Sequence, residues 1–368
     1  MRGGKRHQGA IKKMKILVIN CGSSSIKYKF FDMPGQRLIS KGTIEHIGEK
    51  GSQIQDHYTG LKLILGKIDS VDAVGHRVVH GAEKFRRPVL IDSPVIRKIR
   101  QCCAIAPLHN PANLEGILAC KRLLSGVKQV AVFDTAFHQT IPDYAYVYGL
   151  PYEYYKRHGI RKYGFHGTSH EYVAHEAAKL LKKPEHKLKL ITCHLGNGCS
   201  ITAIDQGKSV DTSMGFTPLE GLVMGTRCGD IDPALVPYIM RKKKFDSLQM
   251  DAILNKISGL KGISGVSNDM RILEQKASKG HKRAKLAIEI FTYRIKKYIG
   301  AYMAVMNGCD AIVFTAGIGE NQKSIRDKIC RNLFTHIKNK PKFLVIPTNE
   351  ELMIARQTFR LIEGKNNA

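Results

Sequence analysis

The chain lacks tryptophan and is poor in acidic residues, with 31 Asp and Glu against 59 Lys and Arg. A formal net charge of +28 is typical of proteins that bind a polyanion such as nucleic acid. However, the basic residues are scattered along the chain, and no nucleic-acid-binding motif accompanies them. We therefore interpret the charge as a generally basic, solvated surface and expect no nucleic-acid partner.

Long apolar runs are absent as well. No stretch approaches the roughly 20 residues that span a bilayer, so we expect no membrane partner. Residues 1–13 are basic and are not followed by the apolar core of a signal peptide. We interpret them as a loose N-terminal tail, or as the product of a start placed ahead of a true first residue at Met14.

The nine cysteines include no C-x-x-C pair, which disfavours a disulfide framework or a zinc site. Reduced thiols in a cytoplasmic protein fit this pattern better. His170, Glu171 and His175 resemble a zinc-protease helix, but one residue too many separates the two histidines. We interpret this segment as the surface of a helix.

Two common nucleotide-binding patterns are also missing. Gly207-Lys208-Ser209 would complete a P-loop only with glycine at position 202, where the chain has threonine. Neither Gly196 nor Gly317 begins a full G-x-G-x-x-G pattern, which disfavours a Rossmann site.

What is present is a recurring unit of strand, Gly/Ser turn and strand. It occurs once as KILVIN, CGSSS and IKYKFF (15–31), and again as LKLITCHL, GNGCS and ITAID (188–205). A third Gly turn follows an apolar strand in AIVFTAGIGEN (311–321). Such recurrence within one chain suggests a duplicated α/β domain.

Helices with recognisable ends lie between these units. Apolar spacing predicts helices over 111–124 and 281–306. Thr168 with Glu171, and Thr348 with Glu351, form T-x-x-E capping boxes that predict helices through Leu181 and through Ile362. Strands alternating with helices indicate an α/β fold.

A Gly/Ser turn between strands exposes several backbone N–H groups on one concave side, which forms a nest for phosphate oxygens. Lys27 follows the first turn closely enough to add a positive charge to this phosphate nest. One such turn is also compatible with an ordinary hairpin. Three turns in one chain indicate a single long polyphosphate held from both halves.

At these residues the chain resembles acetate kinases, within the superfamily of actin, sugar kinases and heat-shock ATPases. Nine stretches carry the resemblance, in family order from residue 15 to about 357. They are VINCGSSSIKY, AVGHRVVHGAE, APLHNPANLEGI, VFDTAFHQTIP, YGFHGTSHEYV, CHLGNGCSI, MGFTPLEGLVMGTRCGDIDPA, FTAGIGEN and VIPTNEELMIA.

The resemblance implies a fold of two actin-like, ribonuclease H-like domains that arose by internal duplication, with the active-site cleft between them. We expect the basic tail over 1–13, an N-terminal domain over 14–136 plus 350–368, and a nucleotide-binding domain over 137–349. The family also implies a homodimer.

The implied reaction is reversible transfer of a phosphoryl group from Mg-ATP to acetate, giving acetyl phosphate and ADP. Because acetate is already ionised at pH 7, the reaction needs no general base. It needs positioning and charge neutralisation, for which the planar fork of arginine suits a carboxylate. Arg77 and Arg227 are the candidates, although each could instead pair with a structural acid.

The resemblance assigns catalytic roles to Asp134, His166, Arg227 and Arg77, with His166 stabilising the transition state. It assigns Mg²⁺, which Mn²⁺ can replace, to Asn20 and Glu350. Acetate contacts are expected from Arg77, Val79, Leu108, His109, Phe165 and Pro218. ATP contacts are expected from Ser23, Ser25, Lys27, His194, Leu195, Gly196, Asn197, Gly198, Asp269, Met270, Arg271, Gly317, Ile318, Gly319, Glu320 and Asn321.

Some features depart from the family or leave alternatives. The chain is short for the family, with residues missing near 48–69 and 332–342, and Cys21 replaces the usual alanine, placing a thiol near the phosphates. Val79 favours acetate over propionate, though a propionate or other short-chain acyl kinase remains the nearest alternative. A non-catalytic ATP-binding or nucleic-acid-associated protein is the alternative of another class, but it would be expected to lack one or more of the four catalytic residues.

Overall fold

The computed structural model describes residues 13–336 and 338–364, so the tail expected over 1–13 lies almost wholly outside the described residues. The chain divides into two compact units between Phe133 and Asp134 and again between Asn349 and Glu350. Unit 1 contains the described residues up to Phe133 and those from Glu350 onward. Unit 2 contains Asp134–Asn349.

Unit 1 is built on a mixed sheet with the strand order β3-β2-β1-β4-β6-β5. Its strands are β1 (Met14–Gly22), β2 (Ser25–Met33), β3 (Arg37–Ile44), β4 (Ala73–Val78), β5 (Val89–Leu90) and β6 (Lys128–Phe133). Its helices are α1 (His57–Leu65), α2 (Ser93–Cys102), α3 (Asn110–Leu123) and α14 (Glu350–Ile362). The first three strands form an antiparallel meander, and β4 and β6 continue the sheet in parallel to β1.

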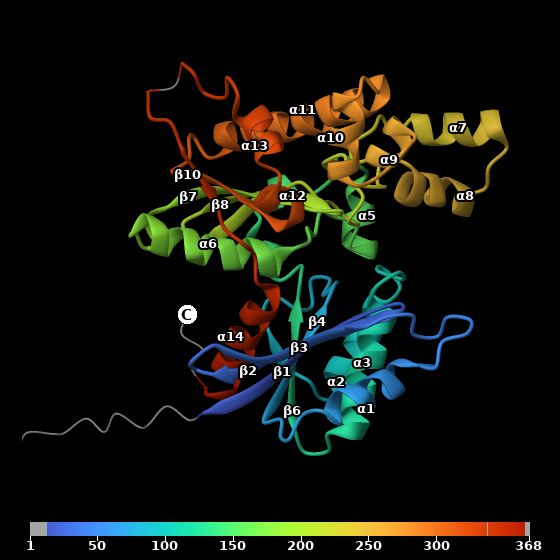
Figure 1. Ribbon diagram of the computed structural model, residues 1–368, viewed down its shortest axis with the longest axis vertical. Helices are drawn as coiled ribbons and strands as arrows, with labels where there is room; N and C mark the ends of the chain where they lie inside the picture. The colour runs from blue at the N-terminus through green and yellow to red at the C-terminus, as the bar shows by residue number, and fades with distance from the viewer. Residues whose placement is uncertain (1–12, 337, 365–368) are drawn as a thin grey trace, which may run out of the picture. The chain divides into compact units, whose positions relative to one another are not determined.

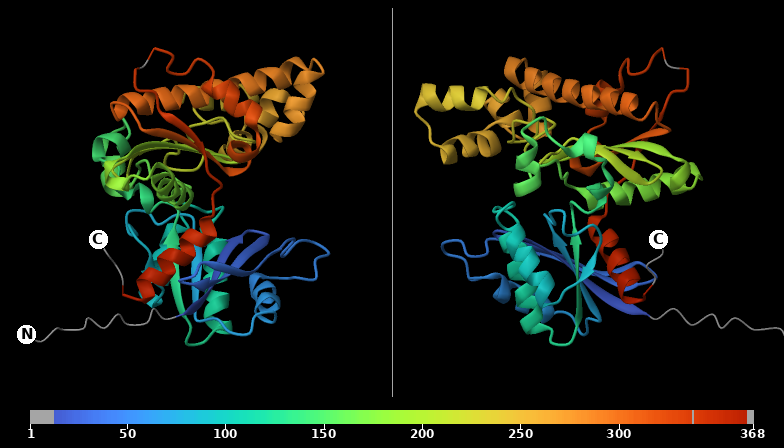
Figure 2. Two further views of the ribbon diagram at one scale, coloured as in Figure 1. Left: turned by 60° about the vertical axis from the view of Figure 1, so that its left-hand side comes forward. Right: turned by 180° about the vertical axis from the view of Figure 1, so that it is seen from behind.

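Helices cover both faces of this sheet (Figures 1 and 2). Side chains alternate along β1, so Leu17 and Ile19 pack into the core formed with α1 and α3. On the opposite face α14 lies against β1 and β4, and Gly75 of β4 leaves room for Ile354. Burial on both faces explains why KILVIN is continuously apolar.

Unit 2 repeats this arrangement with the strand order β11-β10-β7-β8-β9. Its strands are β7 (Lys189–Leu195), β8 (Cys199–Asp205), β9 (Lys208–Thr212), β10 (Ala311–Thr315) and β11 (Lys342–Val345). The antiparallel meander β7-β8-β9 is again extended by two parallel strands, here β10 and β11. The shared order confirms the expected duplication of an α/β domain.

The longer helices of unit 2 are α5 (Tyr152–His158), α6 (Gly167–Leu181), α7 (Leu235–Lys243), α10 (Met270–Ser278), α11 (Lys282–Val305) and α13 (Lys323–Cys330). The shorter ones are α4 (Asp143–Tyr146), α8 (Ser247–Ala252), α9 (Gly259–Ser264), α12 (Ala316–Asn321), η1 (Phe137–Thr140), η2 (Glu185–Lys187) and η3 (Ile253–Ile257). Figure 1 shows α6 and α11 on opposite faces of the sheet, with α10 and α13 near α11 and with α7 and α8 at one end of the unit. None of the helices within the described residues combines the length and apolar character needed to cross a bilayer.

Several local expectations were wrong. Helix α6 begins at Gly167, so Thr168 lies inside its first turn, and the position before the helix is occupied by His166 in a left-handed conformation (φ 57°). Helix α14 begins at Glu350, and the Thr348 hydroxyl instead contacts Ser169 at 2.8 Å. The expected Gly turn after β10 is the short helix α12.

His170 was expected on a helix surface but is fully buried. Its partner in that pattern, His175, lies between Glu171 and Glu185. Cys21 is also buried, with its sulfur packed toward Gly116 of α3, and burial raises the pKa of the thiol to about 12. The Cys21 side chain therefore belongs to the core of unit 1.

Candidate active site

In unit 1 the first candidate residues lie near the carboxyl ends of β1 and β4. Because β1 and β4 run in parallel, Asn20 and Arg77 come side by side: Arg77 Nη1 donates to Asn20 Oδ1 at 3.2 Å. The Nε of Arg77 lies 3.8 Å from Oε2 of Glu350, the first residue of α14. These three residues are far apart in the sequence; the pairing of β1 with β4 and the packing of α14 against both strands bring them together.

This group fits the expected magnesium site in its chemistry. Amide and carboxylate oxygens are the ligands that Mg²⁺ prefers, and Mg²⁺ usually keeps several waters and takes substrate phosphates as further ligands. Burial raises the pKa of Glu350, and the charge of Arg77 opposes that rise. A divalent cation at Asn20 and Glu350 would favour the ionised carboxylate further. Within the described ranges, no three His, Cys, Asp or Glu side chains form a ready-made metal cluster.

Two asparagines that we did not single out from the sequence hold the segment after β4. Asn113 accepts from the Val79 N–H at 3.0 Å and donates to the Cys21 carbonyl at 2.7 Å. Asn110 pairs with both backbone groups of His80, at 3.0 and 2.9 Å. They lie in the LHNPANLEGI stretch, and this was the available signal. Together they fix the backbone that carries Arg77 and Val79.

The other unit 1 candidates differ in exposure. Val79 is buried, whereas Leu108 is 59% exposed and His109, the residue before α3, is exposed as well. Ser23 and Lys27 are exposed and Ser25 is half-buried at the β1–β2 turn. The carbonyl of Gly22 in this turn lies 2.7 Å from Nε2 of His57.

In unit 2 two candidate side chains meet at Gly198, in the turn between β7 and β8. A Cβ atom built on Gly198 would lie 2.7 Å from Nη2 of Arg227 and 3.4 Å from Cε1 and Nε2 of His166. Glycine therefore leaves a small space that a cationic side chain and an imidazole border together. Arg227 Nη1 also donates to the carbonyl of Pro218 at 2.6 Å, and burial lowers the pKa of its guanidinium.

His166 is held by its surroundings on several sides. Its ring stacks on that of His194, with centroids 4.1 Å apart and an interplanar angle of 18°. Its Nδ1 lies 2.9 Å from Oγ of Ser200. The next residue, Gly167, donates its N–H to the carbonyl of Asp134 at 2.9 Å, so buried Asp134 lies beside the same turn. Phe165 is buried directly before it.

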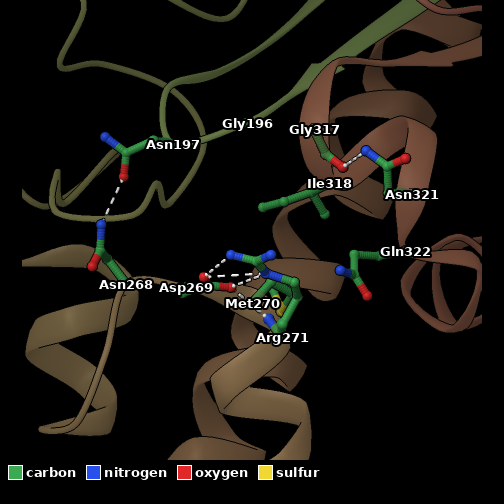
Figure 3. Close-up of a pocket in the computed structure, with 10 residues that line it drawn as sticks. All are labelled: Gly196, Asn197, Asn268, Asp269, Met270, Arg271, Gly317, Ile318, Asn321 and Gln322. Carbon is green, nitrogen blue, oxygen red and sulfur yellow. Dashed lines mark hydrogen bonds and ion pairs between the residues drawn. The ribbon is translucent and has the colours of Figure 1, made fainter.

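A pocket of about 420 Å³ in unit 2 is lined by half of the residues that we expected to contact ATP (Figure 3). The β7–β8 turn, the start of α10 and helix α12 surround it. Its lining consists of Gly196, Asn197, Asn268, Asp269, Met270, Arg271, Gly317, Ile318, Asn321 and Gln322. Asn268 and Gln322 were missed, although each directly flanks a predicted segment.

Hydrogen bonds and an ion pair connect some of the residues that line this pocket. Asn268 donates to Oδ1 of Asn197 at 3.0 Å, and the guanidinium of Arg271 pairs with Asp269. His194, Leu195, Gly198, Gly319 and Glu320 are not among the residues that line this pocket.

Glu320 is engaged with backbone around it. Its Oε1 accepts from the N–H of Ala316 at 2.8 Å and from the N–H of Thr348 at 3.0 Å. A carboxylate that accepts backbone N–H groups at a helix start stabilises that helix end. The structure therefore gives Glu320 a role in holding α12, which lines the 420 Å³ pocket.

Known proteins match this chain over almost its whole length, both in sequence and in structure. A family model described as the acetokinase family matches residues 15–63 and 55–338. The acetate kinase of Halothermothrix orenii is 53% identical, over 95% of this chain and 100% of that protein. Crystal structures of Porphyromonas gingivalis acetate kinase and Francisella tularensis propionate kinase are 42% and 45% identical, with TM-scores of 0.90 and 0.88. They cover 95% and 94% of this chain and 100% and 99% of theirs.

The chain is also shorter than its relatives, as expected. The alignment with the Halothermothrix protein extends over 398 residues, whereas this chain has 368. The two matched ranges overlap at residues 55–63, inside the region 48–69 where we expected missing residues. The two-unit fold, the duplicated strand order and the near-complete match lead to one conclusion: this chain belongs to the acetokinase family.

Proposed function

We propose that this enzyme catalyses reversible transfer of the γ-phosphoryl group of ATP to acetate. The observation that carries the proposal is the space at Gly198, which Arg227 and His166 border in unit 2 next to the 420 Å³ pocket. Phosphoryl transfer requires positive charge and hydrogen-bond donors around the moving group, and this arrangement supplies both.

In the proposed reaction an acetate oxygen attacks the γ-phosphorus while the bond from that phosphorus to the β–γ bridging oxygen breaks. The products are acetyl phosphate and ADP, and no proton needs to be removed from acetate. Arg77 would bind the acetate carboxylate, since its guanidinium can donate two parallel hydrogen bonds. Arg227 and His166 would donate to the phosphoryl oxygens, and Asp134 would support the same turn.

The pocket of unit 2 would hold the nucleoside through the β7–β8 turn, α10 and α12. Asn20 and Glu350 would bind Mg²⁺, with Mn²⁺ as an alternative ion. The metal would neutralise phosphate charge and help to orient the transferred group. Ser23, Ser25 and Lys27, at the β1–β2 turn, would contact the phosphates. Val79, Leu108, His109, Phe165 and Pro218 would form the acetate pocket.

A propionate kinase is the second candidate, and one observation favours it. The Francisella tularensis propionate kinase is 45% identical to this chain, compared with 42% for the Porphyromonas gingivalis acetate kinase. Overall identity therefore does not separate the two substrates. We favour acetate because Val79, which is buried, would narrow its part of the expected pocket, although one methylene is worth only about 1–3 kcal/mol of discrimination.

The test is formation of hydroxylamine-trapped acyl phosphate from Mg-ATP with acetate, propionate or butyrate. We expect acetate to give the highest kcat/KM, and Arg77→Ala to abolish the activity. Arg97→Ala, which removes an exposed arginine from α2, is the matched control and should retain it. A preference for propionate would change the substrate but keep the reaction. No acyl phosphate from any of the three acids would refute the proposed function.

We further expect a homodimer, as the family resemblance implies, which sedimentation analysis of the purified protein would test. The nine cysteines are all free thiols, and thiols persist in a reducing compartment. We therefore propose the cytoplasm as the location.

A further inference from the structure

Three buried side chains form a continuous line of hydrogen bonds that ends on His166. Thr192 Oγ1 lies 2.7 Å from Nδ1 of His170, and Nε2 of His170 lies 2.7 Å from Oγ of Ser200. Oγ of Ser200 in turn lies 2.9 Å from Nδ1 of His166. Thr192, His170 and Ser200 are all fully buried, so their protons must be satisfied within the protein.

The number of protons available on these side chains determines which atom donates in each hydrogen bond. Burial keeps the pKa of His170 well below its ordinary value, so the ring is neutral and has a single N–H. Among the described residues, the Thr192 hydroxyl has no hydrogen-bond partner besides His170. If His170 donated to Thr192, the buried hydroxyl proton would have no acceptor, and an unsatisfied buried donor is destabilising. Thr192 must therefore donate to His170.

Donation by Thr192 fixes the positions of the protons on His170, Ser200 and His166. His170 Nδ1 accepts from Thr192, so its N–H is on Nε2 and donates to Ser200 Oγ. Ser200 then donates its own proton to Nδ1 of His166. A neutral His166 that accepts at Nδ1 carries its proton on Nε2, and that atom borders the space at Gly198 that Nη2 of Arg227 also borders.

We propose that Thr192, His170 and Ser200 are positioning residues that fix His166 in the tautomer with its proton on Nε2. This inference rests on the proposed function for its consequence: neutral His166 then donates to the phosphoryl group without first gaining a second proton. An imidazolium would donate from Nδ1 to Ser200, which would leave one hydroxyl proton of the line, on Ser200 or on Thr192, without an acceptor.

Other charged or titratable groups also surround this line. His194 of β7 stacks on His166, and Arg227 and the backbone of Asp134 lie at the same turn. His138 of η1 packs edge-on against His170, with ring centroids 5.8 Å apart. Burial lowers the pKa of His138 to about 4, so it remains neutral near pH 7.

The test uses ¹⁵N-histidine NMR on the full-length protein, with His166 signals assigned by their loss in His166→Asn. We expect wild-type His166 to be neutral with its proton on Nε2 at pH about 7 to 9. Ser200→Ala should shift the nitrogen signals toward a mixture of tautomers, and Ser200→Thr, which keeps the hydroxyl, should restore them. Ser209→Ala is the matched control, because it removes an equivalent buried contact of 2.9 Å to His138.

Kinetics supply the second readout. We expect Ser200→Ala to lower kcat about tenfold with little change in KM for ATP, as removal of an orienting contact predicts. In the wild type, kcat should stay level from pH about 7 to 9 because neutral His166 is the donor. A wild-type proton on Nδ1, or Ser200→Ala signals that match the wild type, would overturn the inference. Because the NMR experiment needs no turnover, it remains decisive even if no acyl phosphate forms.

Discussion

Adding a single methyl group at Gly198 should disable the reaction while leaving the fold intact. The new Cβ would lie 2.7 Å from Nη2 of Arg227, whereas carbon and nitrogen in contact are about 3.5 Å apart. The guanidinium must therefore retreat by roughly 0.8 Å. It can do so cheaply, because Nη2 is the far end of a flexible side chain and Gly198 does not use the left-handed conformation that only glycine adopts freely.

The kinetic cost should be large. A displacement of about 1 Å in a group that positions substrate can cost 10²-fold in rate, which corresponds to about 2.7 kcal/mol of transition-state stabilisation. We therefore expect Gly198→Ala to lower kcat for acyl phosphate formation about 100-fold, with a melting temperature close to that of the wild type. The assay is hydroxylamine trapping at saturating ATP and acetate.

Gly300→Ala provides the control, since it adds the same methyl group at an exposed site of α11 where nothing lies within 4 Å. A folded Gly198→Ala enzyme with kcat within about threefold of the wild type would refute the reasoning, because a shift of this size should cost far more. Arg227 and His166 would then not work together at this position.

Three further predictions concern other parts of the molecule. Glu350→Gln removes the carboxylate beside Arg77, so the Mg²⁺ concentration needed for half-maximal activity should rise about tenfold in a metal titration; an unchanged requirement would exclude Glu350 as a ligand. Gly300→Ala should itself raise the free energy of unfolding by about 0.5–1 kcal/mol through helix propensity, measured by urea denaturation, and a lower value would contradict the exposed helical environment. Burial lowers the pKa of both His76 and His138 to about 4. The unfolded chain therefore binds protons first, and stability should fall as pH drops from about 6.5 toward 4, by roughly 1.4 kcal/mol per pH unit for each histidine; equal urea midpoints at pH about 7 and 5 would argue against two neutral buried histidines.

The sequence by itself determined the fold family and several of the main strands and helices. Apolar strands such as KILVIN and the Gly turns after them obey short-range rules of side-chain alternation and backbone freedom, so they are readable without tertiary information. The recurrence of that unit also predicted the duplication that the two strand orders confirm. Helix ends were less accurate because capping depends on which backbone groups are already satisfied. At α6, the Asp134 carbonyl accepts the Gly167 N–H and His166 takes the left-handed position, so Thr168 no longer caps the helix.

Only the tertiary structure decided what the individual side chains contact. Parallel pairing of β1 and β4 brings Asn20 to Arg77, and packing of α14 adds Glu350. Likewise, His170 gives no sign in the sequence that it is buried and linked through Ser200 to His166, since these residues lie on a helix and a strand that meet only after folding. Hydrogen-bond direction depends on burial and on every partner in the line, and neither property is encoded in residue type or spacing.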